Sequence, residues 1–166
     1  DTIRLSELHN VLPPATELRR HGSPYRVLVS YRSYRFPLMI YLGKRPSRTL
    51  LALYNGAVDR SKSRNGIVFQ RSSWIEDFHT DLVAFADPTL LKNRSLTIGW
   101  GQLSEAVYGN YAYAVILRRL RDVLNLASPE HTVHFGSSAG GFQAISVATY
   151  DLFLYTSDAA DEEDSV

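Results

Sequence analysis

The sequence contains no cysteine, and this absence excludes a whole class of chemistry. Disulfide bonds, thiolate nucleophiles and zinc sites with cysteine ligands cannot form within these 166 residues. Because disulfides are rare in the reducing cytoplasm, the absence is compatible with a cytoplasmic protein, which is the location that we expect. Histidine and carboxylate residues show no metal-ligand spacing either, so we expect no metal ion and no cofactor.

Long apolar runs and an excess of charge are also missing. No apolar run approaches the roughly 18 to 20 residues that a membrane-spanning helix needs, and no signal peptide is visible. The 18 basic and 17 acidic residues leave a net charge of +1. Proteins that bind nucleic acid or membrane surfaces electrostatically carry a clear basic patch or excess. We therefore expect neither a nucleic-acid partner nor a membrane span.

Methionine occurs once, at Met39, so we expect that the sequence does not begin at a native start. Residues 155–166 at the other end are acidic and rich in small side chains, which is typical of a disordered tail. The stretch LYTSDAADE at 154–162 also resembles the conceptual translation of a transposase sequencing adapter, in which case the natural sequence stops near Leu154. We therefore set residues 155–166 apart as a non-native or disordered tail.

The remaining residues have the composition of one domain with a substantial core, since 45% of the chain is hydrophobic. After a polar N-terminal segment, residues 1–24, apolar runs bounded by turn residues predict strands at 25–31, 37–42, 49–54, 81–86 and 132–135. Helical spacing predicts helices at 104–126 and 139–150. Such alternation predicts an α/β fold over residues 25–154, with a mostly parallel sheet and flanking helices.

One stretch, HTVHFGSSAGGFQAISVATY at 131–150, combines a short strand pattern, a cluster of small residues and a helical pattern. It predicts a strand, a sharp turn and a helix, with Ser138 at the apex of the turn. Gly136 and Gly140 flank this serine in the pattern G-x-S-x-G, because so sharp a turn leaves no room for side chains at those positions. The serine oxygen would lie near free N–H groups at the helix N-terminus, which stabilise developing negative charge.

This strand, turn and helix resemble the nucleophile elbow of the α/β-hydrolase superfamily. The resemblance implies an incomplete α/β-hydrolase fold in which Ser138 is the nucleophile and Ser137 is a variable neighbour. It also implies an oxyanion hole: the backbone N–H of Ala139 would be the first donor, and that of Gly56 or Ala57, after the third strand, the second. The alternative is a glycine-rich turn in another doubly wound fold, with both serines merely capping a helix.

The chain contains no histidine after Ser138. All five histidines come earlier: His9, His21, His79, His131 and His134. In the superfamily the acid and then the histidine follow the nucleophile, so the resemblance implies that both lie outside this chain and that the chain alone is inactive. Asp151 comes too early to be this acid. We interpret His134 as a structural histidine, and His79 with Asp77 as a pair on a helix surface.

The resemblance implies a serine esterase or acyltransferase that acts on an acyl ester of a small molecule or a glycan through an acyl-serine intermediate. The stretches FADPTLL at 85–91 and LTIGWGQ at 96–102, with the aromatic-rich helix after them, resemble hydrolase-like proteins linked to bacterial surface polysaccharides or accessory secretion. A non-catalytic binding or assembly protein of the same fold, in such a pathway, is the alternative.

Several large or charged residues lie next to the predicted loops. Trp74, Trp100 and Tyr108 could line a substrate cleft or simply belong to the core. Asp87, followed by a proline, ends a predicted strand at the edge where such folds bind ligands, and it could shape the pocket or cap a helix.

Overall fold

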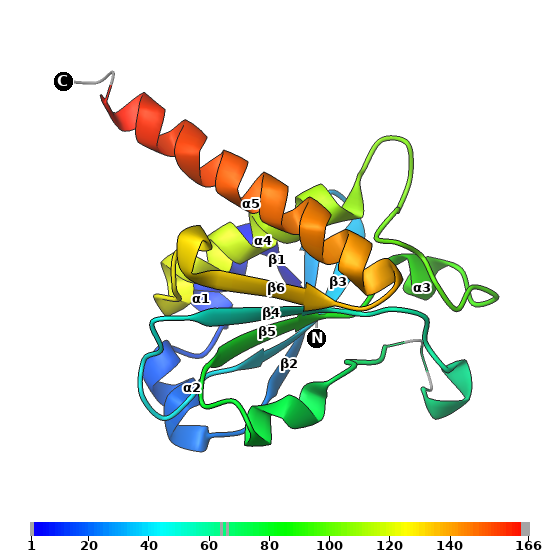
Figure 1. Cartoon of the computed structure of the whole chain (residues 1–166), viewed down its shortest axis with the longest axis horizontal. Helices are drawn as coiled ribbons and strands as arrows, with labels where there is room; N and C mark the ends of the chain where they lie inside the picture. The colour runs from blue at the N-terminus through cyan, green and yellow to red at the C-terminus, as the bar shows by residue number, and fades with distance from the viewer. Residues whose placement is uncertain (1, 64, 66, 164–166) are drawn as a thin grey trace.

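A computed structural model describes residues 2–63, 65 and 67–163 of the chain, and its centre is a six-stranded sheet (Figure 1). The strands are β1 (Thr2–Arg4), β2 (Tyr25–Tyr31), β3 (Tyr34–Tyr41), β4 (Leu50–Tyr54), β5 (Asp81–Phe85) and β6 (Thr132–Gly136). Their spatial order is β1-β2-β3-β5-β4-β6. Strand β3 is antiparallel to both of its neighbours, and all other neighbouring pairs are parallel. The predicted α/β class with a mostly parallel sheet is confirmed.

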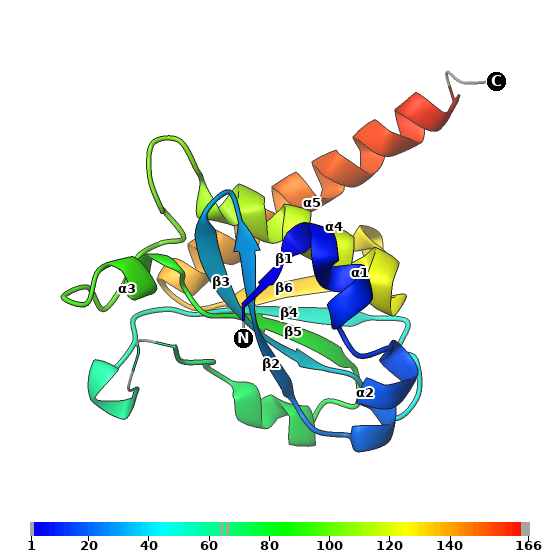
Figure 2. The same cartoon turned by 180° about the vertical axis from the view of Figure 1, so that it is seen from behind.

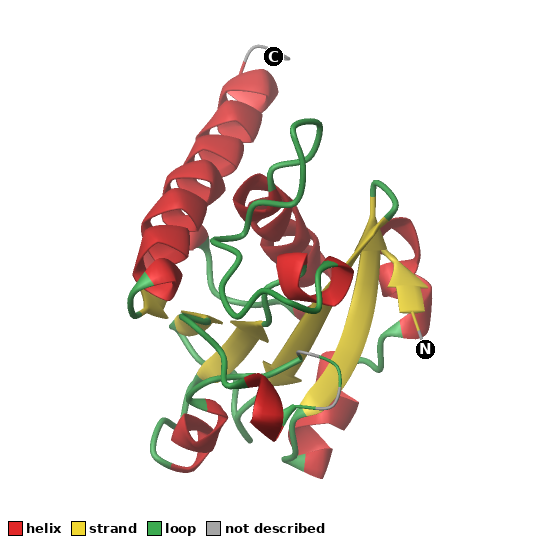
Figure 3. Cartoon of the chain, turned by 90° about the vertical axis from the view of Figure 1, so that its right-hand side faces the viewer, coloured by secondary structure: helices red, strands yellow, loops and turns green. Residues whose placement is uncertain are grey.

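The helices are distributed unequally over the two faces of the sheet. The α-helices are α1 (Leu8–Val11), α2 (Ala15–His21), α3 (Thr89–Lys92), α4 (Gly109–Leu124) and α5 (Ala139–Glu163). Short 3-10 helices are η1 (Leu5–Glu7), η2 (Arg60–Lys62), η3 (Ser72–Glu76) and η4 (Pro129–His131). Helices α4 and α5 pack against each other on one face of the sheet, and η3 lies on the other face (Figure 1). Figure 3 shows the sheet with helices on both of its faces. Helix α1 contacts α4 beside the N-terminal strand (Figure 2).

The core consists of two hydrophobic clusters, one on each face of the sheet. Beneath α4 and α5, the ring of Phe85 stacks on Tyr54 at 5.4 Å and packs against Tyr113 at 4.5 Å. The opposite cluster is smaller and is formed by Met39, Leu51, Leu53, Leu82 and Ala84. It is covered by side chains around η3, namely Phe69, Trp74 and Ile75. Since successive strand residues point to opposite faces, β4 can be apolar throughout and completely buried.

The helix predicted at 104–126 is shorter than expected. Helix α4 begins at Gly109, because the preceding residues fold back and Gln102 forms an antiparallel bridge with Tyr108. Gly109 lies so close to Gly101 that any Cβ would overlap the Gly101 carbonyl group. This contact between distant loop residues, rather than helical spacing, determines where the helix starts.

Two further segments differ from the sequence-based boundaries. Strand β1 pairs in parallel with β2, so the N-terminal segment joins the sheet. Helix α5, predicted at 139–150, continues to Glu163 and so includes most of the segment set apart as a tail. Residues 164–166 lie outside the described part, and the non-native origin of the segment stays a prediction.

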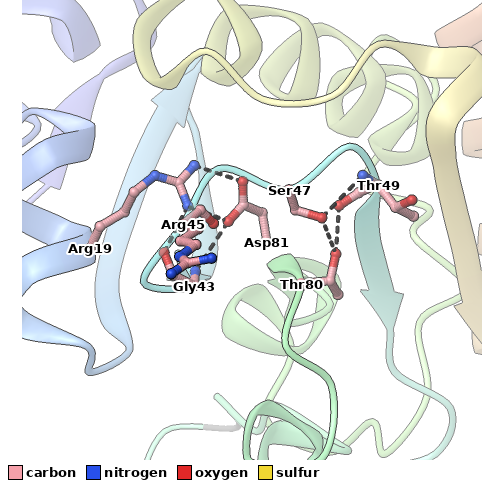
Figure 4. A network of polar contacts seen from close by, with 7 residues as sticks. All are labelled: Arg19, Gly43, Arg45, Ser47, Thr49, Thr80 and Asp81. Carbon is pink, nitrogen blue, oxygen red and sulfur yellow. Dashed lines mark hydrogen bonds and ion pairs between the residues drawn. The ribbon is translucent and has the colours of Figure 1, made fainter.

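A buried ion pair fixes α2 to the sheet at the amino ends of β4 and β5 (Figure 4). Both guanidinium Nη atoms of Arg19 donate hydrogen bonds to the Asp81 carboxylate, at 2.7 and 2.8 Å. The Gly43 amide donates to the same carboxylate at 3.1 Å, and Arg19 also donates to the carbonyl oxygens of Gly43 and Arg45. Asp81 is 1% exposed. This network fixes the end of the sheet opposite the predicted elbow.

Candidate active site

The connections of the chain change faces of the sheet at the carboxyl ends of β4 and β6. The chain leaves β4 toward η3 on one face of the sheet and leaves β6 into α5 on the other face (Figure 1). The two strands are parallel neighbours in the register Tyr54↔Gly136. In open α/β sheets, ligands bind where neighbouring strands connect to opposite faces in this way. The loops after β4 and β6 are therefore the first place to look for a functional site.

The predicted strand, sharp turn and helix are present around Ser138. This residue is exposed and has φ of 56°. That value lies in the left-handed region, which costs a residue other than glycine about 1–2 kcal/mol of conformational free energy. A Cβ on Gly136 would overlap the Gly140 carbonyl group, and one on Gly140 would lie 2.6 Å from the Tyr54 oxygen. Both glycines are therefore sterically required, as the G-x-S-x-G pattern predicts.

The two adjacent serines have different surroundings. Ser137 Oγ accepts a hydrogen bond from Arg71 at 2.6 Å. By contrast, Ser138 Oγ has no hydrogen-bond partner within residues 2–63, 65 and 67–163. The first turn of α5 closes through the amides of Gly140 and Gly141, and Ala139, as the first helical residue, has an amide without an intrahelical acceptor.

The loop after β4 lies directly against this turn. A Cβ on Gly56 would be 2.8 Å from the Ser137 carbonyl oxygen and 3.7 Å from Cβ of Ser138. Only glycine allows the two backbones to approach so closely. The structure thus brings together the two segments that the sequence singled out, Gly56 with Ala57 and Ser138 with Ala139, although they are far apart in the chain.

Two glutamines that sequence reasoning missed hold this loop in place. The Gly56 amide donates to Gln70 Oε1 at 2.9 Å, and Gln70 Nε2 donates to the Ala57 oxygen at 2.7 Å. The Gln70 amide in turn donates to Asn55 Oδ1, and Gln143 of α5 donates to the Asn55 oxygen. The Gly56 amide is thus already engaged, whereas the Ala57 amide has no acceptor in the described part of the chain.

Arg71, which no sequence pattern singles out, places a positive charge next to the turn that contains Ser137 and Ser138. Its guanidinium lies 5.2 Å from the ring centre of Phe135 and 5.7 Å from that of Trp74, in addition to its hydrogen bond to Ser137. Trp74 also packs on Phe135 at 5.2 Å. Of the two readings of Trp74, packing on the sheet is therefore the one that the structure shows.

None of the five histidines contacts Ser138. His134 Nδ1 is 2.8 Å from the Tyr54 hydroxyl, and its Nε2 is 3.3 Å from Asp151. The same carboxylate accepts two hydrogen bonds from Arg121, at 2.6 and 2.7 Å. The His134 and Asp151 side chains are 7% and 1% exposed. Both residues are thus part of one buried polar network beneath α5.

The protonation states in this network follow from its geometry. Burial opposes ionisation of Asp151, but the hydrogen bonds and charges of His134 and Arg121 outweigh it and hold the pKa of the carboxyl below its usual value. Burial, with the nearby Asp151 charge, raises the pKa of the Tyr54 hydroxyl. The network therefore contains a carboxylate, a guanidinium and a protonated phenol, all occupied with one another.

The other sequence-based candidates lie elsewhere or have structural contacts. His79 lines a cavity of about 650 Å³, and no hydrogen bond or ion pair joins it to Asp77 within the described residues. His131 Nδ1 is 3.1 Å from Ser128 Oγ. Asp87 is buried and accepts hydrogen bonds from the amides of Thr89 and Gly101. It therefore caps the start of α3 and holds the loop that carries Trp100.

Among the described residues, no group of three or more histidine and carboxylate side chains could hold a metal ion. The same part of the chain has no helix with both the length and the apolar character needed to cross a membrane. Comparison of the sequence with protein-family models finds no match, and neither do comparisons with curated proteins and with solved structures.

Proposed function

We propose that this chain carries the nucleophile and the oxyanion hole of a serine hydrolase of the α/β-hydrolase type, which acts on an acyl ester. The observation that carries the proposal is the placement of Ser138. It is an exposed serine held at φ of 56° between strand β6 and the N-terminus of α5, with a second backbone loop against it. Strained residues of this kind are concentrated at functional sites, and a nucleophile elbow has this strand, turn and helix context.

In the proposed reaction, Ser138 Oγ attacks the carbonyl carbon of the ester while a base takes the hydroxyl proton. The tetrahedral intermediate collapses as the alcohol oxygen leaves with that proton, and an acyl-serine ester remains on the chain. Water hydrolyses this ester in an esterase, and a second alcohol takes the acyl group in an acyltransferase. The substrate is a small-molecule or glycan acyl ester.

Negative charge that develops on the carbonyl oxygen requires hydrogen-bond donors. We assign the first to the Ala139 amide, which is at the N-terminus of α5. The second is the Ala57 amide rather than that of Gly56, because the latter already donates to Gln70. Loss of one such donor typically lowers the rate on the order of a hundredfold or more. Gln70 would act as a positioning residue that holds the Ala57 amide in place.

A base for Ser138 is the remaining requirement, because an unassisted serine hydroxyl is a weak nucleophile. His134 is engaged by Tyr54 and Asp151, and no other described histidine lies at the elbow. The proposal therefore includes a histidine and an acid from residues beyond those described, in the order that the superfamily resemblance implies.

The proposal can be tested on this chain by supplying the base as a small molecule. We expect a fluorophosphonate probe to label the protein slowly, and added imidazole to accelerate the labelling. Mass spectrometry should locate the adduct on Ser138. The Ser138→Ala variant should lose labelling completely, and Ser137→Ala, which changes the adjacent hydroxyl, should keep it. Labelling that survives in Ser138→Ala would contradict the proposal.

A second candidate is a non-catalytic binding or assembly protein of the same fold. The absence of any described partner for Ser138 Oγ favours it, since a working nucleophile is normally hydrogen-bonded to its base. This candidate predicts that Ser138 is not labelled even with imidazole present. The same experiment therefore separates the two functions.

A further inference from the structure

Trp100 is held in an unusual conformation on the surface. It has φ of 57° and is 44% exposed, although the left-handed region costs a residue with a large side chain free energy and much of its indole remains in contact with water. The strain is therefore maintained by the surrounding structure. Strained residues of this kind are concentrated at functional sites, which makes Trp100 a candidate for a functional role.

Two buried polar side chains lock the loop around Trp100. A Cβ on Gly99 would lie 2.8 and 2.9 Å from the two carboxylate oxygens of Asp87, and one on Gly101 would overlap Asn110 Oδ1. Asp87 accepts a hydrogen bond from the Gly101 amide at 3.1 Å, and Asn110 Nδ2 donates to the Trp100 carbonyl oxygen at 3.2 Å. Asp87 and Asn110 are 3% and 0% exposed. These hydrogen bonds and close contacts hold the loop that carries the indole ring.

The indole lies against the helix that begins at the elbow. Its ring centre is 5.7 Å from that of Phe142, and the two rings meet edge to face at 73°. The Phe142 amide donates to the Ser138 carbonyl oxygen at 3.3 Å, so this phenylalanine is one helical turn from the serine. Helical side chains lean toward the N-terminus of their helix, which brings the Phe142 ring over the turn that starts at Ser138.

We infer that Trp100 and Phe142 form the surface that binds the apolar part of the ester attacked at Ser138. Phe142 is 41% exposed, so two uncharged aromatic rings are available to a ligand beside the serine. Such a surface selects aryl esters or esters with an alkyl chain over small polar ones, because only these bury apolar area against the rings. This inference rests on the proposed function, and it makes Trp100 and Phe142 specificity-determining residues.

The test measures binding without any turnover. The chain has only two tryptophans, so a ¹⁵N-labelled Ser138→Ala protein gives two indole N–H signals, which Trp74→Phe assigns. We expect phenyl butyrate to shift the Trp100 signal in a saturable way and to leave that of Trp74 in place. Ethyl acetate should require at least roughly tenfold higher concentrations, since it offers little apolar area.

Matched variants of one helix provide the control. Phe142→Ala should raise the Kd for phenyl butyrate roughly tenfold, as loss of one aromatic contact predicts. Phe153→Ala should leave it unchanged, although this residue is also an exposed phenylalanine of α5, at 63%. A Trp100 signal that does not move, or equal effects of the two variants, would overturn the inference. Saturable binding without imidazole-dependent labelling of Ser138 would contradict the hydrolase function and support the binding surface. Labelling without binding would support the hydrolase function and contradict the binding surface.

Discussion

The Cα atom of Gly56 faces the carbonyl oxygen of Ser137 so closely that an added Cβ would lie 2.8 Å from that oxygen. This contact joins the loop after β4 to the turn after β6, and it sets the position of the Ala57 amide relative to Ser138. Two strands of a parallel sheet do not by themselves fix the distance between the loops that follow them. Here the absence of a side chain at Gly56 allows the two loops to approach this closely, and the hydrogen bonds of Gln70 and Gln143 hold the loop there.

The first prediction concerns this contact. Gly56→Ala should push the two loops apart, because a carbonyl oxygen of the backbone cannot move as a flexible side chain can. We expect destabilisation of about 1–3 kcal/mol, as for other overpacked sites, and at least tenfold slower labelling of Ser138. Urea unfolding and the fluorophosphonate rate measure the two effects. Gly43→Ala is the control, since its Cβ would meet only ordinary contacts at 3.6 Å and beyond.

The second prediction uses the left-handed conformation of Ser138. Ser138→Gly should stabilise the folded protein by about 0.5–1 kcal/mol, because glycine adopts φ of 56° without the steric cost. Ser138→Ala keeps the Cβ and should leave the stability nearly unchanged. Both variants lack the hydroxyl, so the difference in their urea midpoints reports the backbone strain that glycine relieves, less the extra conformational entropy that glycine loses on folding. Equal midpoints would contradict the prediction, because the relief of strain would then not exceed this entropy cost.

The strand, sharp turn and helix around Ser138 and five of the six strands could be predicted from the sequence, because their signals are local. Alternating or continuous apolar runs define β2 to β6, and the small residues around Ser138 define the turn. Strand β1 has only three residues and no pattern of its own, so nothing in the sequence distinguishes it from a loop.

The parts that could not be predicted depend on contacts between distant residues. Gln70 and Gln143 hold the loop after β4 through single hydrogen bonds, and a lone glutamine gives no sequence signal. The predicted start of α4 is wrong because helical spacing continues back to residue 104. The close contact of Gly109 with Gly101 instead requires the chain to turn before Gly109, where the helix begins. The sequence also does not decide whether Trp100 packs in the core or lines a substrate cleft, because a single tryptophan next to a loop is compatible with both.

The third prediction concerns the ion pair between Arg19 and Asp81. Asp81→Asn should lower stability by about 3–5 kcal/mol, because a guanidinium that is only 10% exposed would lose its counter-charge. Glu7→Gln removes a carboxylate from the largely exposed pair with Arg4 and should hardly move the urea midpoint. Similar losses in the two variants would contradict the structural role assigned to Asp81.

The fourth prediction concerns the edge of the sheet. Within the described residues, β6 pairs only with β4, and Val133 and Phe135 of this strand are 52% and 39% exposed. An apolar edge strand with free backbone groups invites pairing with a second copy. Val133→Lys should therefore increase the monomer fraction in size-exclusion chromatography at high protein concentration. Thr149→Lys, an exposed change on α5, adds the same charge away from the strand and should not.

The fifth prediction is a pH dependence that originates at Asp151. Its pKa is lowered in the folded protein, so ionisation of this carboxyl stabilises the fold at every pH above the unfolded-state value of about 3.9. The contribution is lost as the pH falls through the lower pKa of the folded state, where the ion pair with Arg121 and the contact with His134 disappear. Asp151→Asn should be less stable than the parent at pH 7 and should lose less stability between pH 5 and pH 3.

Asp122→Asn is the control for this prediction. The Asp122 side chain is 59% exposed, so this variant should follow the parent at each pH. Parallel stability curves for Asp151→Asn and the parent would show that the carboxylate is not the group that titrates.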